Sequence, residues 1–343
     1  LLRELRQHGP TQRLPCVLIS ERTDAISVRA VLPLAPAAYL GKPYDLDNIR
    51  QRLDKLLPRS AGGIGRARQV DASLDSFLER MRLNNRGAPL SEAAHAAIES
   101  LLAGQSDLAE EHAALVCDPQ VTARVISFVN SHGPQQDQPS QTLEQALLRL
   151  GNKRSQELLG QLASQRNARL ADPRLAAQAV KLTNQALYGA ELAAWLARRL
   201  QLDARLCYTA GLLQNIGELA LLRTLQDWLD GGGELDEAEL QRHLAERAAG
   251  YGSALRARWR LPLGLRQLIG AYYALGAGAL SREALVLNLV RLLMELPPET
   301  PPAHLAESRP ARLLRLDPTL LEQAPLAAGR RFPFLPAPCP IPA

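Results

Sequence analysis

Histidine and cysteine are the residues whose spacing most directly indicates a metal site or a reactive thiol. The four cysteines lie roughly a hundred residues apart without a CxxC pair, so neither a zinc ribbon nor a disulfide framework is indicated. No two of the six histidines share a predicted helix at positions i and i+4. Reduced thiols and surface or half-buried histidines are therefore the simplest interpretation. These residues are Cys16, Cys117, Cys207, Cys339, His8, His95, His112, His132, His243 and His304.

Gln214 and Asn215 interrupt an otherwise apolar stretch. Amide side chains in such a place commonly hydrogen-bond to neighbouring helices. The alternative is that they are the remnant of a polar pocket that binds a small molecule.

An arginine-rich stretch surrounds Trp259 and has no acidic residue between positions 254 and 270. Basic residues beside an aromatic ring are compatible with nucleic-acid binding. Residues 198–266 as a whole hold ten Arg and nine Asp or Glu, so the wider region is nearly neutral. We therefore favour a solvated helix face over a nucleic-acid surface. The arginines are Arg256, Arg258, Arg260 and Arg266.

The elements that position these residues follow from hydrophobic spacing. Short apolar runs at 15–19 and 37–40 predict two strands of a parallel sheet, and the first strand is predicted to be buried on both faces. Apolar residues at 45–57 recur every three or four positions, which predicts an amphipathic helix. Residues 1–57 therefore read as part of an α/β domain. Residues 58–72, with Pro58, Ser60 and several glycines, form the predicted linker.

Residues 73–295 show nearly continuous helical spacing, so this part is predicted to be entirely helical. Ser73, Ser91, Asp118 and Thr142 are predicted to cap helices, and single long helices are predicted over 174–200 and 204–225. Twelve of the 24 prolines fall between positions 297 and 342. The segment 296–343 is therefore predicted to be mostly irregular or extended.

Three polar residues stand at the ends of the two predicted strands. Ser20 follows the first, and Tyr39 and Lys42 belong to the segment AAYLGKPY at 37–44. The arrangement resembles the C-terminal part of a response-regulator receiver domain, which has a flavodoxin-like α/β fold. The resemblance implies that Ser20 and Lys42 contact a phosphoryl group on an aspartate and that Tyr39 rotates on phosphorylation. A hydroxyl and an ammonium can stabilise the roughly two negative charges of a phosphoryl group.

The receiver resemblance also implies a phosphoacceptor Asp and a metal-binding acidic pair, which would lie before Leu1. We therefore expect the intact parent protein to carry them. The alternative for Lys42 is a side chain that extends to solvent at a sheet edge.

The helical part resembles the HDOD family. The segment DPQVTARVISFVNS at 118–131 has its pattern of Asp-Pro, Thr and a helix-ending Asn-Ser, and TLEQALLRLG at 142–151 matches its next helix. LCYTAGLLQNIGELALL at 206–222 is similar to the helix that carries the His-Asp doublet in HD phosphohydrolases, the relatives from which HDOD proteins derive. The turn WRLP at 259–262 matches a later motif.

This resemblance assigns the former metal-ligand positions of the HD site. Gln185 occupies the first His position, Gln214-Asn215 the doublet, and Ala248 and Tyr272-Tyr273 the later His positions. HD hydrolysis needs a divalent metal that activates a bound water. Neutral amides are poor ligands for a transition metal. We therefore expect no metal, no cofactor and no catalysis.

Composition excludes several broad classes. Of the 343 residues, 46% are hydrophobic and 22% charged, which is typical of globular domains, and the net charge of +5 alone selects no partner. No window has the roughly 18 uninterrupted apolar residues needed to cross a bilayer, so no membrane association is expected. A cytoplasmic location follows from the reduced thiols.

Together these features predict a mainly α protein, in which an all-helical HDOD module at 73–295 follows the C-terminal part of a receiver domain. The predicted function is non-catalytic output in a two-component phosphorelay. The expected partners are a sensor histidine kinase acting on the intact receiver, an unidentified signalling protein, and a second copy in a homodimer. The alternatives are a metal-dependent phosphohydrolase of nucleotides or cyclic dinucleotides, and a nucleic-acid-binding regulator.

Overall fold

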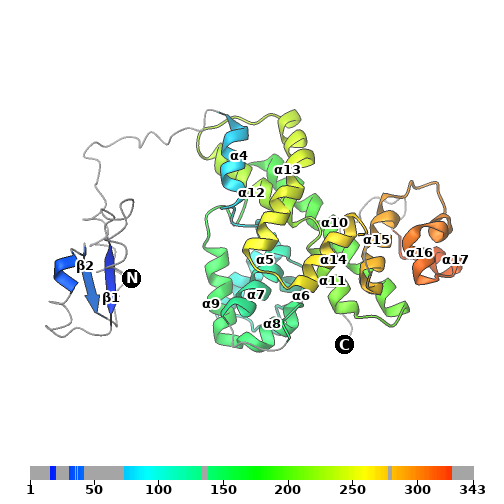
Figure 1. The fold of residues 1–343 in the computed structure, drawn as a ribbon, viewed down its shortest axis with the longest axis horizontal. Coiled ribbons are helices and arrows are strands. Elements are labelled where there is room, and N and C mark those ends of the chain that lie inside the picture. The colour runs from blue at the N-terminus through cyan, green and yellow to red at the C-terminus, as the bar shows by residue number, and fades with distance from the viewer. Residues whose placement is uncertain are drawn as a thin grey trace. The chain divides into compact units, whose positions relative to one another are not determined.

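A computed structural model of the chain describes residues 16–20, 31–34, 36, 38–41, 73–132, 138–276 and 280–326. The chain divides into two compact units, Leu1–Val70 and Asp71–Ala343 (Figure 1). The second unit is mainly helical, as the sequence predicts.

The first unit contains a parallel pair of strands, β1 (Val17–Ser20) and β2 (Ala38–Gly41), with the short 3-10 helix η1 (Leu32–Leu34) between them in sequence. Both strands occur at the predicted apolar runs, and their parallel direction is the predicted one. The register places Ser20 opposite Gly41, the residue before Lys42. Lys42, the side chains of Ser20 and Tyr39, the 45–57 helix and the 58–72 linker lie outside the described residues.

The second unit is built from α-helices and one further 3-10 helix in its described part. Figure 1 shows α5 to α9 gathered at one end of this unit and α16 and α17 at the other. The elements are α4 (Leu74–Arg82), α5 (Glu92–Leu102), α6 (His112–Val116), α7 (Pro119–His132), α8 (Leu143–Leu150), α9 (Asn152–Ala163), α10 (Pro173–Arg199), α11 (Ala204–Leu212), α12 (Ile216–Leu229), α13 (Glu237–Arg258), α14 (Leu263–Tyr273), α15 (Arg282–Glu295), η2 (Pro302–Glu307), α16 (Arg309–Leu314) and α17 (Pro318–Glu322).

Polar side chains fix the starts of several helices, as predicted. The hydroxyls of Ser73, Ser91 and Thr142 accept hydrogen bonds from backbone N–H groups in the first turns of α4, α5 and α8. The buried Asp118 does more, because one carboxylate oxygen accepts from the Val121 N–H at 2.8 Å and the other from the Ser91 N–H at 2.7 Å. Asp118 thereby joins the starts of α5 and α7.

The long helix α10 is the centre of the unit and packs against α11, α12 and α15. Its buried face consists mostly of Ala and Leu, so neighbouring helices approach closely. The closest approach joins α12 to α13, where a Cβ built on Gly217 would lie 2.2 Å from the Ala248 carbonyl oxygen. Only glycine fits this position without displacing backbone.

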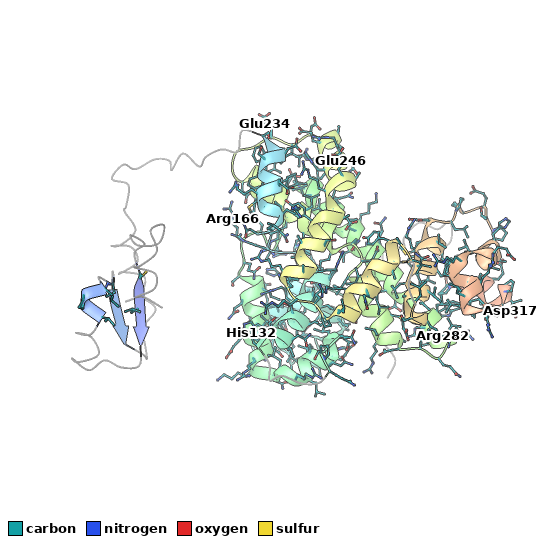
Figure 2. The ribbon with its side chains drawn as sticks, in the orientation of Figure 1. His132, Arg166, Glu234, Glu246, Arg282 and Asp317 are labelled. Carbon is teal, nitrogen blue, oxygen red and sulfur yellow. The ribbon has the colours of Figure 1, made fainter. Side chains whose placement is uncertain are left out.

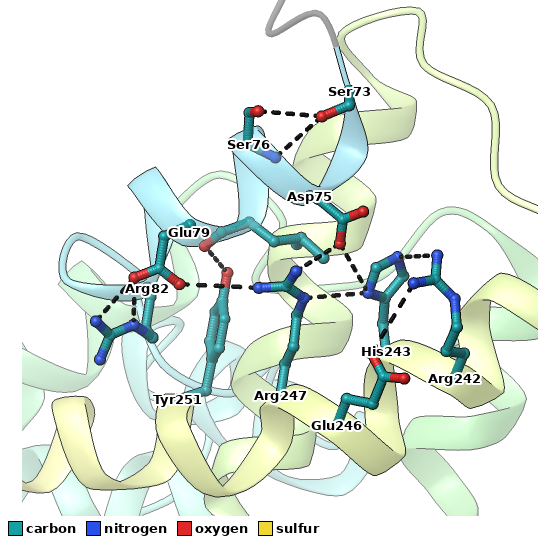
Figure 3. Close-up of polar contacts among 11 residues, drawn as sticks. Ser73, Asp75, Ser76, Glu79, Arg82, Arg242, His243, Glu246, Arg247 and Tyr251 are labelled. Carbon is teal, nitrogen blue, oxygen red and sulfur yellow. Dashed lines mark hydrogen bonds and ion pairs between the residues drawn. The ribbon is translucent and has the colours of Figure 1, made fainter.

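Helices α4 and α13 are joined by a polar cluster that we term the α4–α13 clasp, formed by Asp75, His243, Arg247 and Tyr251 (Figure 3). The Arg247 guanidinium donates to the Asp75 carboxylate and to His243 Nδ1. The Tyr251 hydroxyl donates to the Leu78 carbonyl oxygen at 2.7 Å. Because these contacts connect residues distant in sequence, the clasp fixes α4 on the rest of the unit.

The predicted single helix over 204–225 is wrong, because the chain leaves helical geometry between α11 and α12. Asn215 has φ −104° and ψ 26°, and its side chain bonds to another helix. Residues on both sides of the break are buried, so the apolar spacing runs through it without interruption. Apolar spacing alone therefore could not reveal the break.

The expectation that 296–343 is mostly irregular is also wrong for its described part. Residues 302–322 form η2, α16 and α17, and these pack on α15 and on one another. Pro302, Pro310 and Pro318 each stand in the first turn of one of these helices. Proline is favoured there because the first N–H groups of a helix have no partner within it.

Candidate functional site

Five residues assigned to the former HD metal site converge on one cavity. Gln185 of α10, Gln214 and Asn215 at the α11–α12 break, and Tyr272 and Tyr273 of α14 line a space of about 340 Å³, which we term the amide pocket. Its other lining residues are Leu182, Glu218, Arg291, Met294 and Glu295.

Ala248, the remaining assigned position, does not line the amide pocket. It is buried on α13, where its carbonyl oxygen faces Gly217 of α12. Its role in the described unit is to let these two helices pack closely.

The break between α11 and α12 directs both amides into the interior. Asn215 Nδ2 donates to the Leu182 carbonyl oxygen at 2.6 Å, which joins the break to α10. The Tyr273 hydroxyl donates to the Gln214 carbonyl oxygen at 2.6 Å. The hydrogen bond predicted for the Asn215 side chain is therefore present, whereas the Tyr273 contact reaches the backbone of Gln214 and not its amide side chain. Asn215 Oδ1 is buried and has no hydrogen-bond partner among the described residues.

Glu218 is a pocket residue that sequence reasoning missed. It lies in the first turn of α12 and is half-buried. Burial raises the pKa of this carboxyl, while a backbone hydrogen bond and the charge of Arg256 oppose that rise. A carboxylate three residues after Asn215 within an apolar stretch was the available signal.

The opposite wall comes from α14 and α15. The Tyr272 hydroxyl donates to Met294 Sδ at 3.4 Å, and burial raises the pKa of Tyr272 above the ordinary phenol value. Arg291 donates to the Glu295 carboxylate at 2.8 Å and also to the Tyr273 carbonyl oxygen. The charges on this wall are therefore paired with each other.

The donor set of the amide pocket suits hydrogen bonding to a polar ligand. Its groups are amides, two phenols and the Glu218 carboxyl, while the Glu295 carboxylate is engaged by Arg291. Within the described ranges, no group of three or more His, Cys, Asp or Glu residues is placed to hold a metal ion.

The arginine-rich stretch around Trp259 does not form the single solvated face that the sequence suggested. Arg256 is partly buried and faces Glu218, whereas Arg258 donates to the Asn85 carbonyl oxygen at 2.8 Å. Trp259 itself is buried, and the Arg124 guanidinium stacks over its ring at 5.0 Å from the centroid. The stretch therefore contributes to two different parts of the unit.

None of the described helices is long and apolar enough to pass through a membrane.

Among solved structures, the chain is similar to two crystal structures of the MmoQ response regulator from Methylococcus capsulatus str. Bath. The first has 20% identity and a TM-score of 0.49, with 67% of this chain and 98% of that chain covered. The second, a fragment of residues 20–298, has 18% identity and a TM-score of 0.47, with 70% and 95% covered.

A third similar structure is an HDOD domain protein of unknown function from Geobacter sulfurreducens. Its identity is 17% and its TM-score 0.34, with 74% of this chain and 90% of that chain covered. A search of curated proteins gave no match.

The HDOD domain family matches residues 88–275, a range that includes Gln185, Gln214, Asn215 and both tyrosines of the amide pocket. The match spans more than half of the 343 residues. The chain therefore belongs to the HDOD family.

Proposed function

We propose that the helical unit is a non-catalytic signalling module, the output part of a two-component regulator. The observation that carries this proposal is the amide pocket. It holds Gln185, Gln214 and Asn215 at the positions where the resemblance to HD phosphohydrolases puts metal ligands.

The chemistry of these side chains supports the proposal. HD hydrolysis depends on a metal ion that lowers the pKa of a bound water, and neutral amides bind such ions weakly. Asn215 Nδ2 is also engaged by the Leu182 carbonyl oxygen. The Asn215 amide therefore acts as a structural link between α10 and the α11–α12 break.

The input to this module comes from an aspartyl phosphate upstream in the intact parent protein, placed there by a sensor histidine kinase. Ser20 and Lys42 receive the phosphoryl group, and Tyr39 packs inward. The parallel register of β1 and β2 supports this role, because it pairs Ser20 with Gly41, the residue before Lys42 in the sequence, and parallel sheets bind ligands at their carboxyl ends.

The output is a change in how the helical unit presents its surface to a signalling protein or to a second copy. Light scattering over a range of concentrations, together with capture of partners from the native cytoplasm, tests this part. A strictly monomeric chain with no captured partner would contradict it.

Metal analysis and an activity assay test the absence of catalysis. The full chain is purified without chelators, its metal content is measured, and hydrolysis of a chromogenic phosphodiester and of cyclic dinucleotides is assayed with added Mn²⁺, Fe²⁺ or Mg²⁺. We expect no stoichiometric metal and no turnover. Bound metal at one per chain, with hydrolysis that a chelator abolishes, would replace the proposal by the phosphohydrolase alternative.

The double variant Gln214→His with Asn215→Asp sharpens this test. We expect it to remain inactive, because the other assigned ligand positions still hold Gln185, Ala248 and two tyrosines in place of histidine. Substantial turnover would show that the assignment of the other positions is wrong.

Hydrogen exchange on the intact parent protein tests the coupling. Adding beryllofluoride as a phosphate mimic is expected to change exchange across 45–72 and within the helical unit. Lys42→Ala should abolish the change, whereas the control Lys181→Ala, at an exposed position on α10, should not. Changes confined to the surroundings of Ser20 and Lys42 would show that the first unit is a passive attachment.

A further inference from the structure

A second cavity of the helical unit is lined by arginines. Its volume is about 380 Å³, and we term it the arginine pocket. Four segments distant in sequence contribute one arginine each, and one of these, Arg166, lies at the flank of the unit (Figure 2). The lining residues are Asn85, Arg86, Arg124, Gln165, Arg166, Arg258 and Trp259.

The charges of this pocket are only partly neutralised. Arg166 pairs with Asp230 at 3.1 Å and with Asp227 at 3.7 Å. In the described ranges, no carboxylate lies within ion-pair distance of Arg86, Arg124 or Arg258. Three cationic side chains therefore face one concave space without a counter-charge.

Their mutual repulsion and partial burial have a measurable consequence at Arg124. Burial and the neighbouring charge of Arg258 lower the pKa of this guanidinium. A bound anion would remove both disadvantages, because it would screen the repulsion and supply hydrogen-bond acceptors.

The walls of the pocket are held in place by a buried arginine. Arg223 of α12 is 2% exposed, and its guanidinium donates to the Ala88 carbonyl oxygen at 3.1 Å and to the Arg166 carbonyl oxygen at 2.7 Å. It also donates to Gln165 Oε1 at 3.2 Å. Burial lowers the pKa of Arg223 to about 10, so it stays charged at neutral pH and adds to the positive potential.

Two further contacts fix the lining side chains. Arg258 donates to the Asn85 carbonyl oxygen at 2.8 Å, and Arg124 stacks on Trp259. A binding site with fixed walls loses less conformational entropy when a ligand binds. The pocket therefore has the rigidity of a built site, with Arg86 as its freely exposed cation.

We propose that the arginine pocket binds a small anion that carries at least two phosphoryl groups, either inorganic diphosphate or the diphosphate part of a nucleotide. Guanidinium groups match phosphate oxygens through paired N–H donors, and the positive charges of the three unneutralised arginines outnumber the roughly two negative charges of one phosphoryl group. Trp259 is only 6% exposed and is covered by Arg124, which leaves no ring face for stacking a base. The covered ring also disfavours a single-stranded polymer, whose bases bind by stacking on aromatic rings. This proposal is independent of the signalling role.

Titration calorimetry of the full chain with inorganic pyrophosphate tests the proposal. We expect binding of one pyrophosphate per chain, with an affinity that falls as salt is added. Arg86→Ala should weaken binding about tenfold, since it removes charge-assisted hydrogen bonds. Because the Arg86 side chain is exposed, this variant should keep the wild-type unfolding temperature. The matched control Arg154→Ala removes an exposed arginine from α9 and should bind normally.

A parallel titration with ADP distinguishes the two sources of the anion. Tighter binding of ADP that Arg86→Ala weakens would support a nucleotide, and equal or weaker binding would support free diphosphate. Failure of both to bind would overturn the proposal. So would an equal loss of affinity in Arg154→Ala, which indicates general electrostatic attraction.

The last measurement is the binding of a labelled single-stranded oligonucleotide. If it binds more tightly than pyrophosphate and Arg86→Ala weakens it, the site is a nucleic-acid surface and the small-anion proposal is wrong.

Discussion

The amide pocket and the arginine pocket are similar in volume, about 340 and 380 Å³, and lie in the same helical unit. In the first, Arg291 on the wall is paired with Glu295, and the Asn215 amide links the α11–α12 break to α10. In the second, three of four arginines lack a partner carboxylate within the described part of the chain. The resemblance directs attention to the first pocket, but the unneutralised charge that a ligand would satisfy lies in the second.

Helix α13 lines the arginine pocket and also packs on α12, whose first turn lines the amide pocket. Near its middle, α13 carries Ala248, which packs on Gly217 beside the amide pocket, and its last residue, Arg258, lines the arginine pocket. Variants can therefore be chosen that affect one pocket, the other, or the packing of α13 on α12.

The largest expected effect comes from the buried arginine below the second pocket. Arg223→Met removes the donors to the Ala88 and Arg166 carbonyl oxygens and to Gln165. Leaving such acceptors unsatisfied should lower the free energy of unfolding by about 4 kcal/mol. Urea unfolding gives the magnitude. Hydrogen exchange should increase around 85–90 more than around 213–218, and an equal increase would show that the pockets are not separately supported.

The second-largest loss of stability is expected for Gly217→Ala, at the contact between α12 and α13. The added Cβ would meet the Ala248 carbonyl oxygen, so the helices must separate, and we expect a loss of about 3 kcal/mol in unfolding free energy. Gly270→Ala in α14 is the control, since nothing lies within 4 Å of its added Cβ. The control should be neutral or stabilising by up to about 1 kcal/mol. Equal melting temperatures for the two variants would contradict the close packing.

Asn215→Asp tests whether the amide pocket depends on neutral donors. The new carboxylate would face the Leu182 carbonyl oxygen, which now accepts from Asn215 Nδ2, and about 2 kcal/mol of stability should be lost at neutral pH. Repulsion from that oxygen raises the folded-state pKa of the introduced carboxyl. The loss should therefore shrink as pH falls through that raised value, since the protonated group can donate again. A pH-independent loss would mean that packing, not the donated hydrogen bond, is what matters.

The smallest effect concerns the α4–α13 clasp, which joins α4 to the helix that carries Arg258. Burial above all, together with the charge of Arg242, lowers the pKa of His243 below 6.5. The charges of Asp75 and Glu239 oppose this shift. The unfolded chain therefore takes up the proton first, and stability should fall as pH drops below about 6.5.

Asp75 responds in a different range. The Arg247 guanidinium lowers the pKa of this carboxyl, so its contribution is present above about 3.9 and is lost only as pH falls further. Urea midpoints at pH about 7.5 and about 5.5 thus isolate His243 within the clasp. His243→Gln should reduce the pH dependence of the unfolding free energy by less than about 1 kcal/mol. The control His304→Gln, at an exposed position, should leave that pH dependence unchanged.

Local signals in the sequence were sufficient to predict most of the helices and their starts. Ser73, Ser91 and Thr142 cap as predicted, because capping depends on residues within one turn. The break at Asn215 was not predictable from apolar spacing, since its cause is a hydrogen bond to a carbonyl oxygen on α10. The C-terminal helices were missed because proline was interpreted only as a breaker, whereas each first-turn proline fits a helix start.

The two pockets also differ in how far the sequence alone could predict them. Gln185, Gln214, Asn215 and Tyr272 could be assigned to one site because a family motif orders them along the chain. The arginine pocket has no such motif. Its residues come from the segment before α5, from α7, from the segment after α9 and from the end of α13. Only the folded arrangement brings these charges together.

The packing of α15 determines where a recombinant fragment of this domain can end. Asn288 Nδ2 donates to the Ala271 carbonyl oxygen at 3.0 Å, and most of the apolar residues of α15 are buried, so this helix completes the wall of α14. A fragment cut at residue 275, where the family match stops, would leave α14 with an uncovered apolar face and would aggregate. Expression from residue 73 to residue 326 keeps α15 over α14, together with the short helices η2 and α16 that pack on α15.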